Sequence, residues 1–170
     1  MATPSPPPVR AGRLAAASGL ACLSLLLAGC GKEPVNIPTV PLTAADQAVC
    51  QRVVDALPDE VAGQSRRKTQ PAEALGGAWG DPAIVVQCGV PVPAGFTRTS
   101  PCQTADGVGW FVPEGEFAND SSDITIATVG YRPIVQVTIP ATYRPSGLAA
   151  AMVQLAPMVK RYTRLVKPCH

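Results

Sequence analysis

The sequence predicts an α+β fold: a mostly antiparallel sheet of four to six strands, two helices packed on one face of it, and two disulfides. Three observations support this prediction. The run Ala83–Cys88 is almost entirely apolar and β-branched, which is typical of a strand buried on both faces. Several other short segments have strand periodicity or a hairpin turn. Two longer segments repeat apolar residues at the three- and four-residue steps of amphipathic helices.

Length and composition are those of a single compact domain. The chain has 170 residues, 46% of them hydrophobic, which is enough for one core. Only 5% are aromatic, so we expect a core built mainly from Val, Ile, Leu and Ala. Without Arg10 and Arg13, which lie in a segment expected to be removed, 12 basic and 12 acidic side chains remain. This balance argues against nucleic-acid binding through bulk charge.

The N-terminus has the pattern of a bacterial lipoprotein signal. Arg10 and Arg13 precede the apolar run Leu14–Ala28, which is too short for a membrane span. The run ends in Leu27-Ala-Gly-Cys30, which resembles the lipobox, in which the cysteine is linked to diacylglycerol and becomes the first residue after cleavage. Residues 1–29 are therefore predicted to be a signal peptide. A plain secreted protein and an uncleaved anchor are the alternatives.

The predicted lipid anchor at Cys30 places the protein at the extracytoplasmic face of the cell membrane. Residues 30–42 contain Pro34, Pro38 and Pro41 and are expected to form an extended tether. Residues 43–170 would then form a single α+β domain.

Cysteine usage predicts two disulfides. Of six cysteines, Cys22 would leave with the signal peptide and Cys30 would carry lipid. An even number remains, as expected for a domain exposed to an oxidising compartment. These four are Cys50, Cys88, Cys102 and Cys169.

Four cysteines allow three pairings. Cys50 falls on the apolar face of a predicted helix and Cys88 in the buried strand, so we favour Cys50–Cys88. Cys102–Cys169 would then attach the C-terminus to the sheet. A metal site is the alternative, but the chain has no Cys-x-x-Cys spacing and its lone histidine is His170. No metal and no cofactor are predicted.

The first helix begins at a capping box, Thr43-Ala-Ala-Asp46, and is stopped by Pro58. The polar connection that follows, Pro58–Ala78, includes a possible short edge strand near Arg67–Gln70. Its basic triplet, Arg66-Arg67-Lys68, could contact lipid phosphates or an acidic polymer, but a solvated edge strand is the more ordinary interpretation.

A hairpin is predicted after the buried strand. Gln103–Ala105 and Val108–Val112 flank Asp106-Gly107, a dipeptide that favours a turn with positive φ. Two further strands are predicted at Asp123–Val129 and Ile134–Ile139.

The last helix is expected to open at Pro145 or Ser146, with Pro157 kinking or splitting it. Basic residues crowd its end, where we expect them to complement the helix dipole; contact with anionic lipid is the less favoured alternative. They are Lys160, Arg161, Arg164 and Lys167. The apolar stripe of this helix comprises Leu148, Met152, Leu155, Val159, Tyr162 and Val166.

Four motifs in this order resemble the DUF3515 family: Trp79-Gly-Asp-Pro82, Cys88-Gly-Val-Pro91, Asp106-Gly-Val-Gly-Trp110 and Leu155-Ala-Pro157. The resemblance covers most of Ala48–Lys167. It implies an exported protein or lipoprotein of an actinobacterial envelope, without an assigned activity. Members of that family are often encoded near a D-alanine–D-alanine ligase, an association that suggests wall biology without specifying any chemistry.

No catalytic constellation emerges from the sequence, and no catalytic residue is predicted. The leading hypothesis is a non-catalytic binding or scaffolding module of the envelope with a possible protein partner. An exposed face around Trp79, Asp81, Trp110 and Arg132 is the first place to look for contact, although a tryptophan such as Trp79 more often closes a core. The alternative is an envelope hydrolase or ligand-binding enzyme accessory, in which Asp81 would converge with Glu114 or Glu116.

Overall fold

The computed structural model describes residues 32–116 and 120–168. The predicted signal peptide and Cys30 lie outside the described residues, as do Cys169 and His170. The compact unit that carries the fold begins at Glu33.

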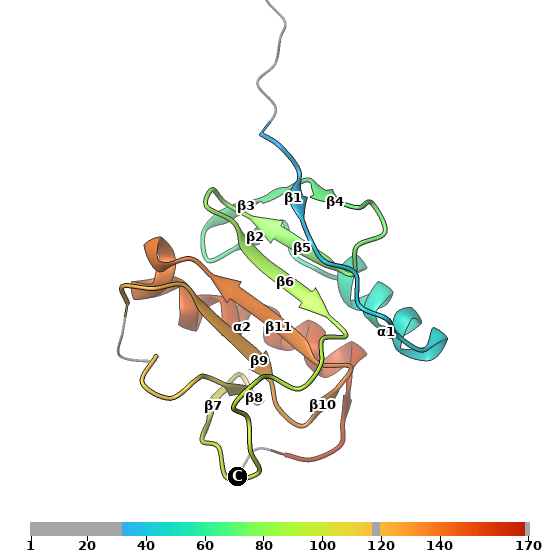
Figure 1. Ribbon diagram of the computed structural model, residues 1–170, viewed down its shortest axis with the longest axis vertical. Helices are drawn as coiled ribbons and strands as arrows, with labels where there is room; N and C mark the ends of the chain where they lie inside the picture. The colour runs from blue at the N-terminus through green and yellow to red at the C-terminus, as the bar shows by residue number, and fades with distance from the viewer. Residues whose placement is uncertain (1–31, 117–119, 169–170) are drawn as a thin grey trace, which may run out of the picture. The chain divides into compact units, whose positions relative to one another are not determined.

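The fold is α+β with a fully antiparallel main sheet, as predicted, but this sheet has eight strands rather than four to six. Its strand order is β2-β3-β5-β6-β11-β9-β8-β7 (Figure 1). Two small ladders accompany it, a parallel β1–β4 pair and an antiparallel β10–β12 pair. The elements are β1 (Val35–Asn36), α1 (Ala44–Asp55), β2 (Glu60–Val61), β3 (Gln64–Arg67), β4 (Thr69–Gln70), β5 (Gly76–Trp79), β6 (Ile84–Cys88), β7 (Cys102–Ala105), β8 (Val108–Phe111), β9 (Ile124–Thr128), β10 (Tyr131–Arg132), β11 (Val135–Ile139), a 3₁₀ turn (Ala141–Tyr143), α2 (Arg144–Tyr162) and β12 (Arg164–Leu165).

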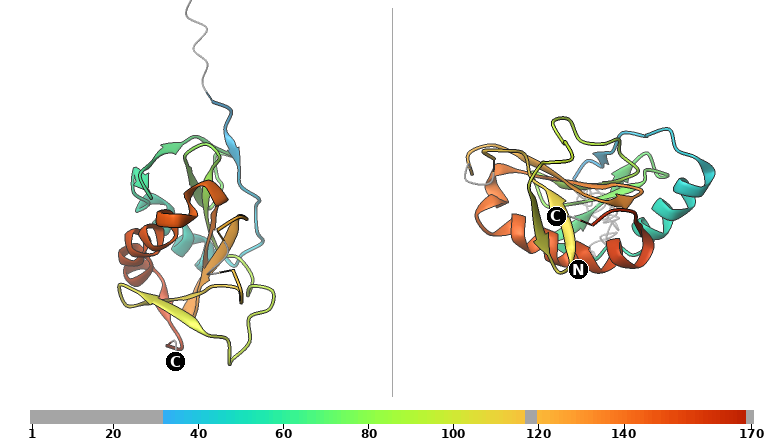
Figure 2. Two further views of the ribbon diagram at one scale, coloured as in Figure 1. Left: turned by 90° about the vertical axis from the view of Figure 1, so that its left-hand side faces the viewer. Right: turned by 90° about the horizontal axis from the view of Figure 1, so that it is seen from below.

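Both helices cover the same face of the main sheet (Figure 2). The core lies between them and the sheet, where alternate residues of β6 and β11 pack against buried residues of α1 and α2. On β6, Ile84 and Val86 are buried on this side, whereas Val85 and Gln87 point the other way and are half-buried. The prediction of a strand buried on both faces holds fully for the face toward the helices and only in part for the other face.

The start of α1 shows the predicted cap. The Thr43 hydroxyl oxygen accepts a hydrogen bond from the backbone N–H of Asp46 at 3.1 Å, which satisfies one of the free donors of the first turn. Cys50 and Val53 face the core. The predicted disulfide between Cys50 and Cys88 is present, and it ties α1 to the end of β6. Because Cys169 lies outside the described residues, the Cys102–Cys169 pairing stays a prediction.

Strand β5 falls within the stretch predicted as a polar connection. Its sequence, Gly-Gly-Ala-Trp, has low strand propensity because glycine has no side chain to pack. Close packing requires these glycines: a Cβ on Gly76 would lie 2.2 Å from the carbonyl oxygen of Val86, and one on Gly77 would lie 2.8 Å from the side chains of Leu57 and Trp79. The prediction failed because tertiary packing here outweighs local propensity.

The hairpin is confirmed. β7 and β8 pair antiparallel with Ala105 opposite Val108, and the turn residues Asp106 and Gly107 both have positive φ, at 44° and 75°. That combination is the backbone geometry of a type I′ turn.

The last helix differs from the prediction in two ways. It runs through Pro157 without splitting. Because proline has no N–H, the Val153 carbonyl has no donor within the helix. Val153 and Pro157 are both exposed, so water can satisfy that carbonyl. The helix also ends at Tyr162, because Thr163 adopts an extended backbone. Val166, predicted on the apolar stripe, lies beyond the helix and is 46% exposed. In the described part of the chain, no helix is long and apolar enough to cross a membrane.

Most of the predicted tether belongs to the fold. Val35 and Ile37 donate backbone hydrogen bonds to the carbonyls of Lys68 and Gln70, and the Ile37 side chain is fully buried. The Pro38 carbonyl accepts a hydrogen bond from the side-chain amide of Gln87. The segment lies against the sheet because Ile37 covers the gap left by Gly76.

The disulfide generates a stability prediction. Cys50 and Cys88 are 38 residues apart, and closing a loop of this length in the unfolded chain is worth about 4 kcal/mol on the chain-entropy model. The double variant Cys50→Ala/Cys88→Ala should lower the free energy of unfolding by roughly that amount in urea denaturation. A wild-type chain that shows the same urea midpoint with and without a reductant that opens this bond would contradict the prediction.

Candidate functional site

Two of the predicted surface residues lie inside the core. Trp79 and Trp110 have no exposed surface, so neither ring can stack on a ligand at the surface. The Trp79 indole donates to the Pro58 carbonyl at 3.0 Å, and the Arg66 guanidinium lies 5.6 Å from its ring centroid. The prediction of an exposed face that includes the two tryptophans is therefore wrong. In a chain with few aromatic residues, both tryptophan side chains pack in the core.

The remaining two residues of that predicted face lie at opposite ends of the sheet. Asp81 comes three residues before β6, and Arg132 comes three residues before β11. Because β6 and β11 run antiparallel, with Cys88 opposite Val135, the two residues are separated by at least the length of β6, roughly 15 Å. They cannot contact one ligand of ordinary size.

The carboxylates of the alternative hydrolase hypothesis each face an arginine. Asp81 forms an ion pair with Arg67 at 3.5 Å. Glu116 forms an ion pair with Arg144 at 3.5 Å, whereas Glu114 is exposed. These are the contacts of salt bridges and do not resemble two carboxyl groups placed on either side of a substrate.

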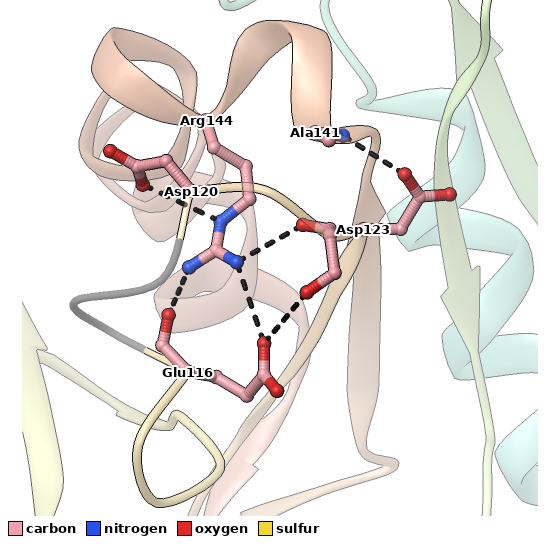
Figure 3. A network of polar contacts seen from close by, with 6 residues as sticks. Glu116, Asp120, Asp123, Ala141 and Arg144 are labelled. Atoms are coloured by element: carbon pink, nitrogen blue, oxygen red, sulfur yellow. Dashed lines mark hydrogen bonds and ion pairs between the residues drawn. The ribbon is translucent and has the colours of Figure 1, made fainter.

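Arg144 is the centre of a buried network at the start of α2 (Figure 3). Its side chain has no exposed surface, and its two terminal nitrogens donate to the backbone carbonyls of Ser122 and Glu116. Its Nε lies 3.8 Å from a carboxylate oxygen of Asp120. The network holds the connection between β8 and β9 against α2, which gives Glu116 a structural role.

A pocket lies at the other end of the sheet, beside Arg132. It has a volume of about 170 Å³ and is formed by the loop that joins β6 to β7, the β9–β10 turn with β10, and the C-terminal segment after β12. We call it the basic pocket. It is lined by Val92, Pro93, Phe96, Arg98, Ser100, Cys102, Thr128, Val129, Gly130, Arg132, Ile134, Val166, Lys167 and Pro168.

The lining of the basic pocket is apolar with three cations. Arg98, Arg132 and Lys167 are exposed, and none of the three makes an ion pair with any residue of the described chain. Among the described residues, no aspartate or glutamate lines the pocket. The surface around it is also unusually apolar, because three of the four large exposed hydrophobic residues of the described chain lie in its wall or next to it. These are Val92, Leu165 and Val166.

Gly130 fixes one wall of the pocket. Its carbonyl accepts hydrogen bonds from the backbone N–H groups of Val166 and Lys167, at 2.7 and 3.2 Å. Its φ is +78°, and a Cβ there would lie 1.6 Å from the Lys167 carbonyl oxygen. Phe96, which also lines the pocket, makes an edge-to-face contact with Phe111, with ring centroids 5.3 Å apart.

Comparison with known proteins identifies the family. The family whose model matches is described as a protein of unknown function (DUF3515), and the match covers residues 13–165. The chain belongs to the DUF3515 family. No curated protein and no solved structure matches it.

Of the three cations that line the basic pocket of this DUF3515 chain, the sequence marked Arg132 as a binding residue but not Arg98 or Lys167. Arg98 lies in a proline-rich loop with no periodicity, so nothing in its neighbourhood marked it. Lys167 is expected from the sequence to complement the dipole of the last helix, but that helix ends at Tyr162, five residues earlier. One feature of the sequence could have pointed to Lys167: more basic residues gather near the C-terminus than are needed to complement a helix dipole.

The buried arginine generates a prediction. Arg144→Met should lower the free energy of unfolding by roughly 3 kcal/mol, because it leaves the Glu116 and Ser122 carbonyls and the Glu116 carboxylate without their cation. Arg52→Met, at an exposed position of α1, should change it by about 0.5 kcal/mol or less. Equal urea midpoints for the two variants would show that the network does not stabilise the fold.

Gly130 generates a second prediction, with a matched control at Gly115. Both glycines have φ of +78°, so an alanine is strained at either one, but nothing lies within 4 Å of a Cβ on Gly115. Gly130→Ala should therefore cost more stability than Gly115→Ala and should release the segment 164–168. Thermal unfolding and amide hydrogen exchange of that segment measure both effects. If the two variants behave alike, the close packing at Gly130 is not what holds the pocket wall.

Proposed function

We propose that this chain is a non-catalytic binding module, anchored by lipid at Cys30 to the outer face of the cytoplasmic membrane, which binds its ligand in the basic pocket. The observation that supports binding is the pocket itself: an apolar hollow with three cations in its lining that, among the described residues, form no ion pair and have no carboxylate beside them in the lining. Binding sites for small molecules are typically apolar, with a few polar groups that fix orientation. General acid–base catalysis needs a positioned proton donor or acceptor, and the described lining residues include no aspartate, glutamate or histidine.

Export is supported by two features of the chain. Leu27-Ala-Gly-Cys30 has the lipobox pattern behind a charged and then apolar segment. The Cys50–Cys88 disulfide lies in the core, and such bonds persist in oxidising compartments. A role in wall assembly, suggested by the family resemblance, would fit a protein in this place.

The anchor would hold the domain close to the bilayer. The Glu33 carbonyl accepts a hydrogen bond from Arg67, and β1 begins at Val35, so the fold starts almost immediately after the predicted lipidation site. Cys30 and Glu33 are three residues apart, a span of at most about 11 Å in an extended chain. Arg67 also donates to the Gly80 carbonyl, so the chain enters the fold at the Asp81 end of the sheet, and the basic pocket lies at the end away from the anchor.

The anchor is tested with two cysteine variants of the full chain. Cys30→Ala should abolish lipidation, so the protein is either released from the membrane fraction or left with its signal segment uncleaved. Cys22→Ala should leave both membrane association and mature mass unchanged, because Cys22 lies in the segment that is removed. Fractionation and intact-mass measurement distinguish these results. A Cys30→Ala protein that keeps the mature mass and the membrane association of the wild type would refute the anchor.

A further inference from the structure

We infer that the ligand of the basic pocket is an anionic amphiphile: a molecule with a compact alkyl or aryl group that enters the hollow and a phosphate or carboxylate that meets the cations at its mouth. This inference rests on the proposed function insofar as it takes the basic pocket to be the binding site. It does not depend on the lipid anchor.

The size and lining of the pocket define the apolar part of the ligand. Phe96, Val129 and Ile134 present hydrocarbon to a volume of about 170 Å³. An apolar cavity of about 150 Å³ in another protein stays dry and binds benzene, so this volume accommodates roughly six carbon atoms. A sugar or a nucleoside would place hydroxyl groups against these walls without enough partners, at a cost in desolvation.

The cations define the charged part. Arg98, Arg132 and Lys167 come from three separate segments of the chain, yet all three line the same small hollow. Within the described chain no carboxylate neutralises them, although 12 acidic residues are present in the sequence. Like charges gathered without a counter-charge repel one another, and a bound anion relieves this repulsion. Arginine and lysine beside apolar walls also form strong, charge-assisted hydrogen bonds to phosphate and carboxylate oxygens.

The surroundings favour an amphiphile over a free inorganic anion. Val92 and Val166, about half exposed, stand at the pocket, and Leu165 lies next to them. Exposed apolar residues gathered at one place mark a contact site. Inorganic phosphate would contact the cations but leave these apolar side chains in water, whereas an alkyl phosphate would contact both the cations and the apolar side chains.

The test is a titration of the chain from Gly31 to His170 with alkyl phosphates. This form contains the whole compact unit, the core and the Cys50–Cys88 disulfide. Ethyl, butyl and hexyl phosphate should bind with affinities that rise roughly fourfold per CH₂, the increment expected for transfer of a methylene out of water. Hexanol and inorganic phosphate should each bind at least ten times more weakly than hexyl phosphate. If the three alkyl phosphates bind with equal affinity, or if hexanol binds as tightly as hexyl phosphate, the inference is wrong.

Charge-removing variants locate the site. Arg132→Gln and Lys167→Gln should each weaken hexyl phosphate binding severalfold, whereas Arg52→Gln, an exposed arginine of α1 outside the pocket, should not. Thermal unfolding of each variant checks that the fold is intact. Identical affinities in the three variants would place the binding elsewhere and refute the assignment.

A second arm distinguishes the source of the ligand. If phosphatidylglycerol vesicles displace hexyl phosphate and phosphatidylcholine vesicles do not, the ligand is a membrane lipid. If neither kind of vesicle changes the binding of hexyl phosphate, the ligand is a soluble amphiphile. Failure of the titration would leave anchoring at Cys30 untouched. Failure of the Cys30→Ala test would in turn leave the titration result standing, so the two proposals fail separately.

Discussion

The structure depends on the burial of the β5–β6 hairpin on both of its faces. On one side, Trp79 and Val86 pack against the helices, and on the other, Ile37 closes over Gly76. Two consequences follow from this arrangement. The residues that precede α1 cannot be a free tether, because Ile37 is part of the fold. The Cys50–Cys88 bond closes at the end of the same hairpin and joins it covalently to α1.

The two ends of the sheet serve different purposes. At one end, Arg144 satisfies backbone carbonyls and carboxylates and so fixes the β8–β9 connection against α2. At the other end, Arg132 and Lys167 stand beside apolar walls without a counter-charge among the described residues. A buried arginine with partners is explained by the fold alone, whereas we attribute the cations around the hollow, which form no ion pair among the described residues, to a ligand. This contrast directs the functional proposal to the end of the sheet that contains Arg132.

Sequence reasoning succeeded where local chemistry determines the outcome. The Thr43 cap, the Asp106-Gly107 turn and the apolar run of β6 each carry their own signal, and all three are present. It failed where distant contacts decide. The glycines of β5 form a strand because neighbouring side chains and backbone leave no room for a Cβ, and α2 stops at Tyr162 because the next residues pair with β10.

The candidate site was only partly predictable for the same reason. Arg98, Arg132 and Lys167 are separated by more than 30 residues from one another along the chain, and no spacing rule connects them. A single sequence does not show which aromatic side chains are buried, and for this reason Trp79 and Trp110 could be predicted as surface residues. Because both tryptophans are buried, the binding hypothesis now rests on a pocket that contains only one residue of the predicted binding face, Arg132.

Hydrogen exchange of the 31–170 chain, measured by mass spectrometry with and without saturating hexyl phosphate, tests most directly whether the basic pocket is the binding site. Slower exchange confined to residues 92–102, 128–134 and 164–168, with no change at the start of α2 in residues 141–148, is the expected result. Protection at 141–148, or no protection at the three pocket segments, would contradict it.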